Sequence, residues 1–470
     1  MRMNRRSFLK GVGAGAAGRA AASALPRFHV LAANTQKLRH AAIGVGGFMG
    51  GGDLRRLADH PDIEIVALCD VDERYLEEAR EGFPDARVYR DWRVLLEEEE
   101  GRIDSINATV PDHSHAPISV SALRKGIHVY CQKPLTRSIH ESRVMAREAA
   151  RSGLVTQMGV QTHNAAYYRT AVAMAQAGVV GRIKEAHSWC IRSERGSFDW
   201  TGDYSDPPTE RRPDREDEVP DYLDWDLWLG AAPERPYAAA SDEGDYWADE
   251  GLYQPMEWRR WRDFAGGTHG DMGGHMMDAV FTCLELTAPK WIETHGTPPY
   301  EETYSGNNKV LHRFPGTRFT TGDIDYYWYD SGPVDTEGWP IAEEDLAMDG
   351  SMLIGERGYL YLPHGSSPEV LPEDDLQDAV EWFEDRIGRQ GDVNHYHQFV
   401  DACLGRGLTS TPFAYGGRLT ETVLMGNIAN LFVGERLEWD ARNLEFPNKP
   451  EADAYLRQAY REGWEIDGLG

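Results

Sequence analysis

The chain has 470 residues, enough for two or three ordinary domains, and 41% of them are apolar. No apolar run approaches the ~20 residues that a membrane-spanning helix needs, so we expect no membrane segment. The formal net charge of −28 excludes electrostatic binding to nucleic acid or to an anionic membrane surface.

Residues 1–33 differ in composition from the rest of the chain. They contain six basic residues, no acidic residue, and a twin-arginine pair at Arg5 and Arg6. A stretch rich in Gly and Ala follows, and small residues come after it. A basic, then apolar, then small-residue order is typical of an export signal rather than of a disordered basic tail. We therefore predict a twin-arginine signal and a periplasmic or other extracytoplasmic location.

Strand and helix patterns alternate through residues 37–165. Apolar strand patterns occur at 39–43, 63–69, 88–89, 105–110, 127–131 and 155–159. Helical patterns lie between them, the first of them at 53–58. This alternation predicts a doubly wound parallel sheet of the Rossmann type.

A different pattern occupies residues 166–440. A helix at 166–177 precedes a long alternating strand at 183–193 and a loop-like region at 195–250. More strands are expected at 291–295, 309–314, 318–329 and 352–362, and helices at 394–404 and 419–432. We predict a C-terminal α/β domain with a large open, mostly antiparallel sheet. Residues 441–470 are expected to form a tail that packs on the domains.

The turn after the first strand has features of a dinucleotide site. Gly44 permits a tight turn, and Gly46 lets the backbone approach a pyrophosphate at a helix N-terminus. Gly47 and Gly50 continue the turn. A strict GxGxxG pattern would have glycine where Met49 stands, so we expect a longer or irregular turn.

Asp70 strengthens this interpretation. It ends the second strand, about 20 residues beyond the turn, where a carboxylate binds the ribose hydroxyls of the cofactor. A carboxylate there repels a 2′-phosphate, so we expect NAD as the cofactor, with NADP less favoured.

Four blocks occur in order: Ile43–Gly47 with Val66–Asp70, Thr109–Pro117, His128–Leu135, and Gly266–His275. Together they resemble the Gfo/Idh/MocA oxidoreductases, the family of glucose–fructose oxidoreductase and inositol dehydrogenase. The resemblance implies nicotinamide-dependent chemistry on a small carbohydrate and a homo-oligomer that associates through the open sheet. The residues expected at the cofactor, besides the glycines and Asp70, are Thr109, Pro111, His115, Gln132, Lys133 and Gln161.

The family's catalytic lysine, aspartate and histidine fall on Lys133, Asp271 and His275. A lysine at the end of a strand can polarise an alcohol or carbonyl oxygen. Asp271 and His275 are spaced i, i+4, so on a helix they face the same way. A histidine can accept the hydroxyl proton as the hydride leaves carbon, and the aspartate can hold substrate or orient its neighbour.

One residue departs from the family pattern. Glutamate usually precedes the catalytic lysine, and this chain has Gln132 there. The missing charge is expected to change the pKa of Lys133 and the hold on the nicotinamide ribose. The amide keeps hydrogen-bonding capacity, so we expect activity to remain.

Further candidates for substrate contact are His163, Tyr167, Trp189, Arg192 and His269. Of these, the indole face of Trp189 can stack on a sugar ring. The histidines with Asp271 could instead ligate a metal, but no tight ligand spacing supports this, and we expect no metal. The five cysteines include no CxxC pair and predict neither a zinc site nor a disulfide framework.

Three functions fit these observations. The first is hydride transfer between tightly bound NAD and a ring hydroxyl of a sugar, glycoside or cyclitol. The second is cleavage of a glycoside through transient oxidation and elimination, which needs an additional base such as His163, His269 or Tyr167. The third is sugar binding without catalysis, which the intact set of Lys133, Asp271 and His275 disfavours.

Overall fold

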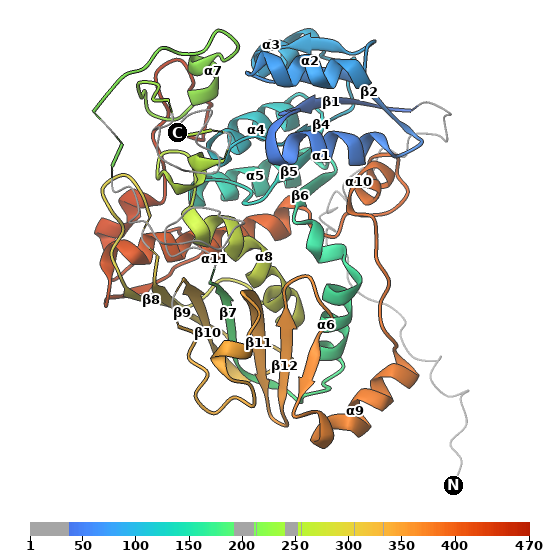
Figure 1. The fold of residues 1–470 in the computed structure, drawn as a ribbon, viewed down its shortest axis with the longest axis vertical. Coiled ribbons are helices and arrows are strands. Elements are labelled where there is room, and N and C mark those ends of the chain that lie inside the picture. Colours follow the sequence, from blue (N-terminus) through green and yellow to red (C-terminus); the bar gives the residue numbers. More distant parts are fainter. Residues whose placement is uncertain are drawn as a thin grey trace, which may run out of the picture.

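The computed structural model describes residues 37–191, 211–212, 214–239, 252–254, 256–304, 306–331 and 333–470. The predicted signal at residues 1–33 and the candidate Arg192 lie outside these ranges. Within them the chain forms two sheets with helices between and around them (Figure 1).

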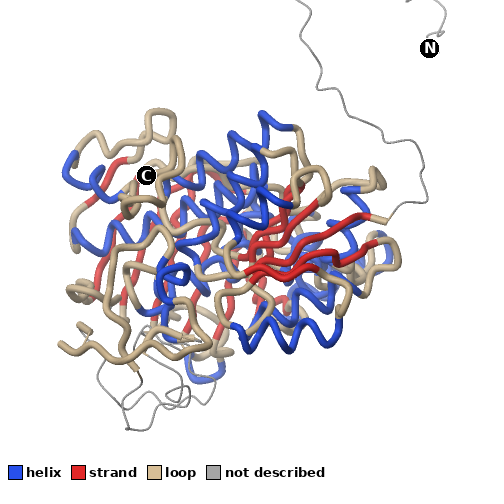
Figure 2. Tube along the Cα trace, turned by 90° about the horizontal axis from the view of Figure 1, so that it is seen from above, coloured by secondary structure: helices blue, strands red, loops and turns tan. Residues whose placement is uncertain are grey.

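The first sheet is parallel throughout and confirms the predicted doubly wound domain. Its strand order is β3-β2-β1-β4-β5-β6. Helices flank the strands of this sheet on both sides (Figure 2). The strands are β1 Leu38–Ile43, β2 Ile63–Cys69, β3 Arg87–Tyr89, β4 Ser105–Ala108, β5 His128–Gln132 and β6 Thr156–Gly159. The helices are α1 Gly47–Ala58, α2 Glu73–Gly82, α3 Trp92–Glu98, α4 His115–Arg124 and α5 Ile139–Ser152.

Helix α1 begins at Gly47, six residues before the predicted start at Asp53. The glycine-rich stretch was expected to be turn because glycine weakens helices. Here the residues from Gly47 onward form the first helical turns, with Gly46 as the N-cap. The helix N-terminus therefore lies directly at the end of β1.

The second sheet has eight strands in the order β13-β12-β11-β7-β10-β9-β8-β14. All neighbouring pairs are antiparallel except β7 and β10, so the sheet is mostly antiparallel, as predicted. The strands are β7 Ile183–Cys190, β8 Trp291–Gly296, β9 Asn308–Phe314, β10 Thr320–Asp330, β11 Asp349–Gly355, β12 Tyr359–Pro363, β13 Glu369–Leu371 and β14 Arg436–Glu438.

Two long helices lie between the sheets (Figure 1). Helix α8, Gly267–Leu284, packs on β7 and β11 of the second sheet, and α11, Phe413–Ala429, packs between α8 and α5 of the first domain. Both are largely buried. The other helices are α6 Ala166–Gln176, α7 Trp225–Leu229, α9 Glu373–Arg386 and α10 His395–Cys403. Helix α8 therefore connects the second sheet to the layer that faces the Rossmann domain.

The C-terminal part of the chain returns to the first domain. Helix α10 packs on α1, and the Tyr396 hydroxyl donates to Asp53 of α1 at 2.7 Å. The backbone of His140 donates to the carbonyl of Leu456, and the Tyr460 hydroxyl donates to Glu141 at 2.6 Å. These contacts attach both α10 and the final segment to the cofactor half of the molecule.

None of the helices in the described ranges has both the length and the apolar character needed to cross a bilayer. The five cysteines all lie in those ranges and are buried free thiols. The sequence analysis predicted no disulfide framework.

Candidate active site

A cavity with about 1620 Å³ of empty space, open solvent included, lies where strands of the parallel sheet end. This is the edge at which doubly wound sheets bind ligands. The predicted residues on its wall are Gly44, Gly46, Gly47, Gly50, Asp70, Thr109, Pro111, Gln132, Lys133, Gln161, Asp271 and His275. The structure thus brings the proposed cofactor and catalytic residues together in one cavity.

The turn between β1 and α1 requires glycine. Gly44 has a φ of +81°, and a Cβ atom there would lie 2.0 Å from the carbonyl oxygen of Thr109. A Cβ at Gly46 would lie 1.9 Å from the Tyr75 ring. The turn therefore keeps its backbone exposed to the cavity, next to the N-terminus of α1. Backbone N–H groups at a helix N-terminus fit the pyrophosphate of a dinucleotide.

Asp70 lies at the end of β2 and holds this turn in place. Its carboxylate accepts hydrogen bonds from the backbone N–H groups of Val45 at 2.9 Å and Gly46 at 3.3 Å. Burial raises the pKa of Asp70 to about 6. At neutral pH the carboxylate is charged and able to accept from ribose hydroxyls. Arg90, after β3, also lines the cavity.

Lys133 and Asp271 form the central ion pair of the site. The Lys133 Nζ atom donates to Asp271 Oδ1 at 2.5 Å and to the Asp271 carbonyl oxygen at 2.9 Å. The Arg259 Nε atom lies 3.6 Å from the same Oδ1. Burial disfavours the charged form of Asp271, but the two cations hold its pKa well below the usual range. Asp271 is therefore a permanent anion that positions Lys133.

His275 lies one helical turn beyond Asp271 on α8, which confirms that the two residues share a helix. Both line the cavity. The His275 ring also lies beside His364, with 5.8 Å between ring centroids. A histidine in this place can exchange a proton with a hydroxyl bound in the cavity.

Asp112 is a second carboxyl group in the same wall, and the sequence analysis did not select it. It is 3% exposed. Burial, together with the negative charge of Asp271, raises the pKa of Asp112 to about 8. The group is therefore mainly protonated at neutral pH and can donate a hydrogen bond into the cavity. Its position inside the Thr109–Pro117 block was the available signal.

Gln132 has a structural reason to replace the usual glutamate. Its Nε2 atom donates to Asp53 Oδ2 at 2.6 Å, and the Asp53 carboxylate also accepts from Thr109 and Tyr396. Asp53 is fully buried, and burial raises its pKa. A glutamate at position 132 would place a second carboxylate against the first. The acidic group of this region is thus carried by α1 instead of β5.

Five predicted site residues within the described ranges do not line the cavity. Trp189 is fully buried in the second sheet, where its Nε1 atom donates to the Ala347 carbonyl oxygen, so it cannot stack on a sugar. His269 is 1% exposed and stacks on Trp328. Its side chain points away from Asp271 because the residues are only two apart on a helix.

His115 is the third. Its ring nitrogens lie 2.8 Å from the carbonyl oxygens of Pro134 and Val110. Burial lowers the pKa of His115 to about 4, although the two carbonyl oxygens act in the opposite direction. His115 holds the loop after β4 against the residues that follow Lys133, and it does not itself reach the cavity.

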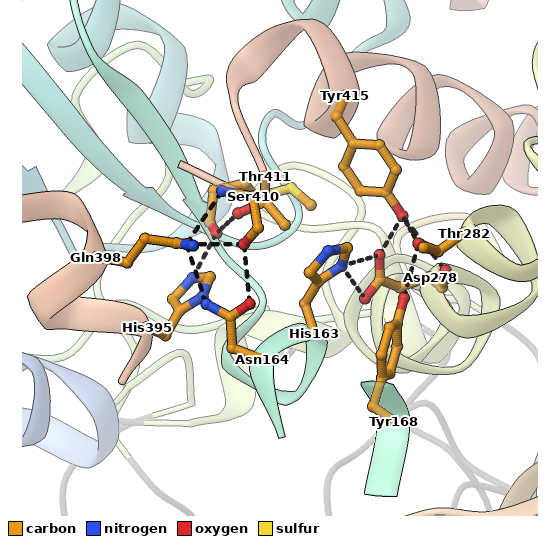
Figure 3. Close-up of polar contacts among 11 residues, drawn as sticks. His163, Asn164, Tyr168, Asp278, Thr282, His395, Gln398, Ser410, Thr411 and Tyr415 are labelled. Carbon is orange, nitrogen blue, oxygen red and sulfur yellow. Dashed lines mark hydrogen bonds and ion pairs between the residues drawn. The ribbon is translucent and has the colours of Figure 1, made fainter. Parts of the chain in front are cut away.

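His163 and Tyr167 lie near the main cavity but do not line it. The His163 Nδ1 atom donates to the buried Asp278 at 3.1 Å, and the Tyr415 hydroxyl donates to the same carboxylate (Figure 3). Tyr167 lines a smaller side cavity. No group of three metal-ligating side chains occurs among the described residues.

Several lining residues escaped the sequence analysis because they come from the segment that precedes α8. They are Leu227, Trp228, Gln254, Met256, Trp258 and Arg259. Arg259 lies over the Trp258 ring, 4.2 Å from its centroid. The available signal was the density of aromatic residues between 222 and 261. Arg259 links this segment to Asp271, with 3.6 Å between Arg259 Nε and Asp271 Oδ1.

Two family models match the chain. One describes the NAD-binding Rossmann fold of an oxidoreductase family and covers residues 38–160. The other describes the C-terminal alpha/beta domain of the same family and covers residues 190–314. The chain belongs to the Gfo/Idh/MocA oxidoreductase family. NAD is the cofactor of its first domain, in agreement with the glycine turn and Asp70.

Similar proteins include D-apiose dehydrogenase of Paraburkholderia graminis, 33% identical over 28% of this chain and 35% of the relative. A glycosyl hydrolase family 109 protein of Stenotrophomonas maltophilia is 35% identical over 28% of this chain and 29% of the relative. These alignments span about a third of each relative. An inositol dehydrogenase homologue of Azotobacter vinelandii, solved with NADH and myo-inositol, has a TM-score of 0.54. It is 18% identical, with 86% of this chain and 98% of that one covered, and shows the same fold.

Asp70→Ala should narrow the preference of this Gfo/Idh/MocA protein for NAD over NADP. The wild-type carboxylate repels a 2′-phosphate, whereas the variant retains Arg90 in the same cavity. Titrating both cofactors into nucleotide-free protein measures the two affinities. Wild-type protein that binds NADP as tightly as NAD would contradict the role of Asp70.

Gln132→Glu should lower the free energy of unfolding by about 1–3 kcal/mol, because the new carboxylate meets buried Asp53. Adding Asp53→Asn should recover most of this loss by restoring an amide–carboxylate pair. Urea unfolding of the wild type, both single variants and the double variant measures the coupling. Additive effects of the two substitutions would show that the pair does not interact.

Proposed function

We propose that this protein transfers hydride between NAD and a ring hydroxyl of a sugar, glycoside or cyclitol. The observation that carries the proposal is the meeting of Lys133, Asp271 and His275 in the cavity that contains the dinucleotide turn. The names of similar proteins, which include dehydrogenases of apiose and levoglucosan, support a carbohydrate substrate.

The residues divide the chemistry among them. Bound NAD supplies the hydride acceptor. Lys133 donates a hydrogen bond to the substrate oxygen, and its ion pair with Asp271 keeps the ammonium in the cavity wall. His275 accepts the hydroxyl proton at a ring nitrogen. Neutral Asp112 can donate to a neighbouring substrate oxygen, and the aromatic side chains before α8 exclude water from that side.

A second candidate is redox-neutral glycoside cleavage, favoured by the family 109 glycosyl hydrolases among the similar proteins. In this reaction a ring hydroxyl is oxidised, the acidified neighbouring C–H loses its proton, the leaving group departs, water adds to the resulting double bond, and hydride returns to the carbonyl carbon. The reaction needs a further base. His163 is bound to Asp278, and His269 is buried against Trp328, so neither contacts the main cavity.

Export by the twin-arginine route and assembly into a homo-oligomer are parts of the same proposal. The basis for export is the order of basic, apolar and small residues in residues 1–33. Since that route carries folded proteins and no NAD pool exists outside the cytoplasm, we expect the cofactor to be loaded before export and held through many turnovers.

Lys133→Ala, Asp271→Ala and His275→Ala should each lower turnover by about 100-fold or more, as lost proton transfer or positioning predicts. A panel of sugars, glycosides and cyclitols, assayed by absorbance of the reduced nicotinamide and by product chromatography, measures this. Circular dichroism of each variant is the control for folding. A His275→Ala variant with near-normal turnover would remove His275 as the main base.

The purified protein should contain close to one NAD per chain without added cofactor. Denaturing it and quantifying the released nucleotide tests this expectation. Isotope-labelled NAD then reports exchange, which should be much slower than turnover. A substoichiometric nucleotide content, together with activity that requires added NAD, would refute retention and weaken the assignment of export.

A further inference from the structure

Two histidines form the wall between the main cavity and a side cavity. His275 of α8 and His364 line both cavities, and their ring centroids are 5.8 Å apart. The side cavity encloses about 370 Å³ of empty space, open solvent included. This space provides room for water.

The position of His364 is set by the second sheet. It follows β12 directly, and its backbone N–H donates to the Asp349 carbonyl oxygen of β11 at 3.0 Å. Gly365 turns the chain away with a φ of +78°. His364 is half-buried, and the next residues of the turn, among them Ser366, are exposed. His364 therefore lies between His275, which is also half-buried, and the exposed residues of the turn.

The side cavity extends from His275 and His364 to the exposed Ser366. Its remaining wall is mostly apolar or aromatic, with Tyr167, Tyr168, Leu362 and Pro368. Tyr168 directs its hydroxyl to Thr282 at 2.9 Å, within the network around Asp278 (Figure 3). The exposed Ser366 is part of the same wall. A proton that reaches His364 thus has a short way to solvent.

This inference rests on the function proposed above, alcohol oxidation. That reaction releases a proton, which has to reach solvent. When a hydroxyl is oxidised, its C–H bond breaks and the hydride, with two electrons, reduces NAD. The O–H bond also breaks, a C=O bond forms, and the proton goes to His275. Each oxidation therefore leaves one proton on a base that must be neutral for the next.

The other titratable groups near His275 do not connect it to the side cavity, since Asp112 and Lys133 line the main cavity alone. Asp271 has a pKa far below neutrality and is bound by Lys133, so it does not hold a proton. His163 is bound to Asp278 and lines neither cavity. His364 is the histidine that, together with His275, lines both cavities.

We propose that His364 is a proton-relay residue that takes the hydroxyl proton from His275, directly or through one water, and releases it to solvent through the side cavity. The relay runs in reverse when a carbonyl is reduced. In the sequence, His364 is a single histidine before Gly365, and this pattern alone does not indicate a function.

The test uses holoenzyme at low buffer concentration. His364→Ala and His364→Gln should lower kcat about tenfold or more, with a smaller change in KM and a smaller loss in the first turnover than in later ones. Added imidazole should restore most of the kcat of His364→Ala, since it can enter the vacated space. His295→Gln, which removes an exposed histidine of β8, is the matched control and should match the wild type with and without imidazole.

Wild-type kcat in both His364 variants, or a loss that imidazole and concentrated buffer do not restore, would overturn the relay. If the wild type oxidises no sugar in the panel, this result contradicts the proposed function and not the relay.

The relay is then tested by histidine NMR of the holoenzyme. A His275 titration midpoint that moves in His364→Gln supports proton coupling between the rings, and an unchanged midpoint overturns it.

Discussion

The ion pair of Lys133 and Asp271 is the contact on which the geometry of the site depends. Lys133 directly follows β5 of the parallel sheet, and Asp271 belongs to α8, which packs on the second sheet. The pair closes at 2.5 Å only when the two sheets have the correct separation. Helix α11, between α5 and α8, sets that separation through apolar packing. The catalytic distance is thus a product of the packing between the two domains.

Three buried carboxyl groups near this pair, Asp271, Asp112 and Asp53, are stabilised in three different ways. Asp271 is ionised because two cations face it. Asp112 lacks such a pairing and stays largely protonated at neutral pH. Asp53 is surrounded by donors, including Gln132. Burying an ion without a partner is costly, and each carboxyl avoids that cost differently. The change from glutamate to Gln132 is understandable only together with Asp53, 79 positions away.

Local patterns in the sequence were sufficient for the fold class and for much of the site. The period of the strands, the glycine turn and the spacing of Asp271 and His275 are local properties. Trp189 shows the limit, because alternation along β7 does not reveal which face of the strand is covered by other residues. His364 reaches the cavity through long-range packing, so nothing near it in the chain indicates its role, and for Arg259 the only local signal was the density of aromatic residues around it. The predicted start of α1 was wrong because helix propensity disfavours glycine, whereas the close approach of Gly50 to the backbone of Gly44 and Val45 leaves no room for a side chain there.

The return of the last residues to the first domain has a consequence for biosynthesis. A ribosome makes the dinucleotide turn early, whereas Tyr396, Leu456 and Tyr460 follow their partners in the first domain by more than 300 residues. The nucleotide-binding half therefore cannot make these contacts until most of the second domain has been synthesised, even though domains often fold in N-to-C order. The packing of the first domain is completed by residues that are translated after most of the second sheet.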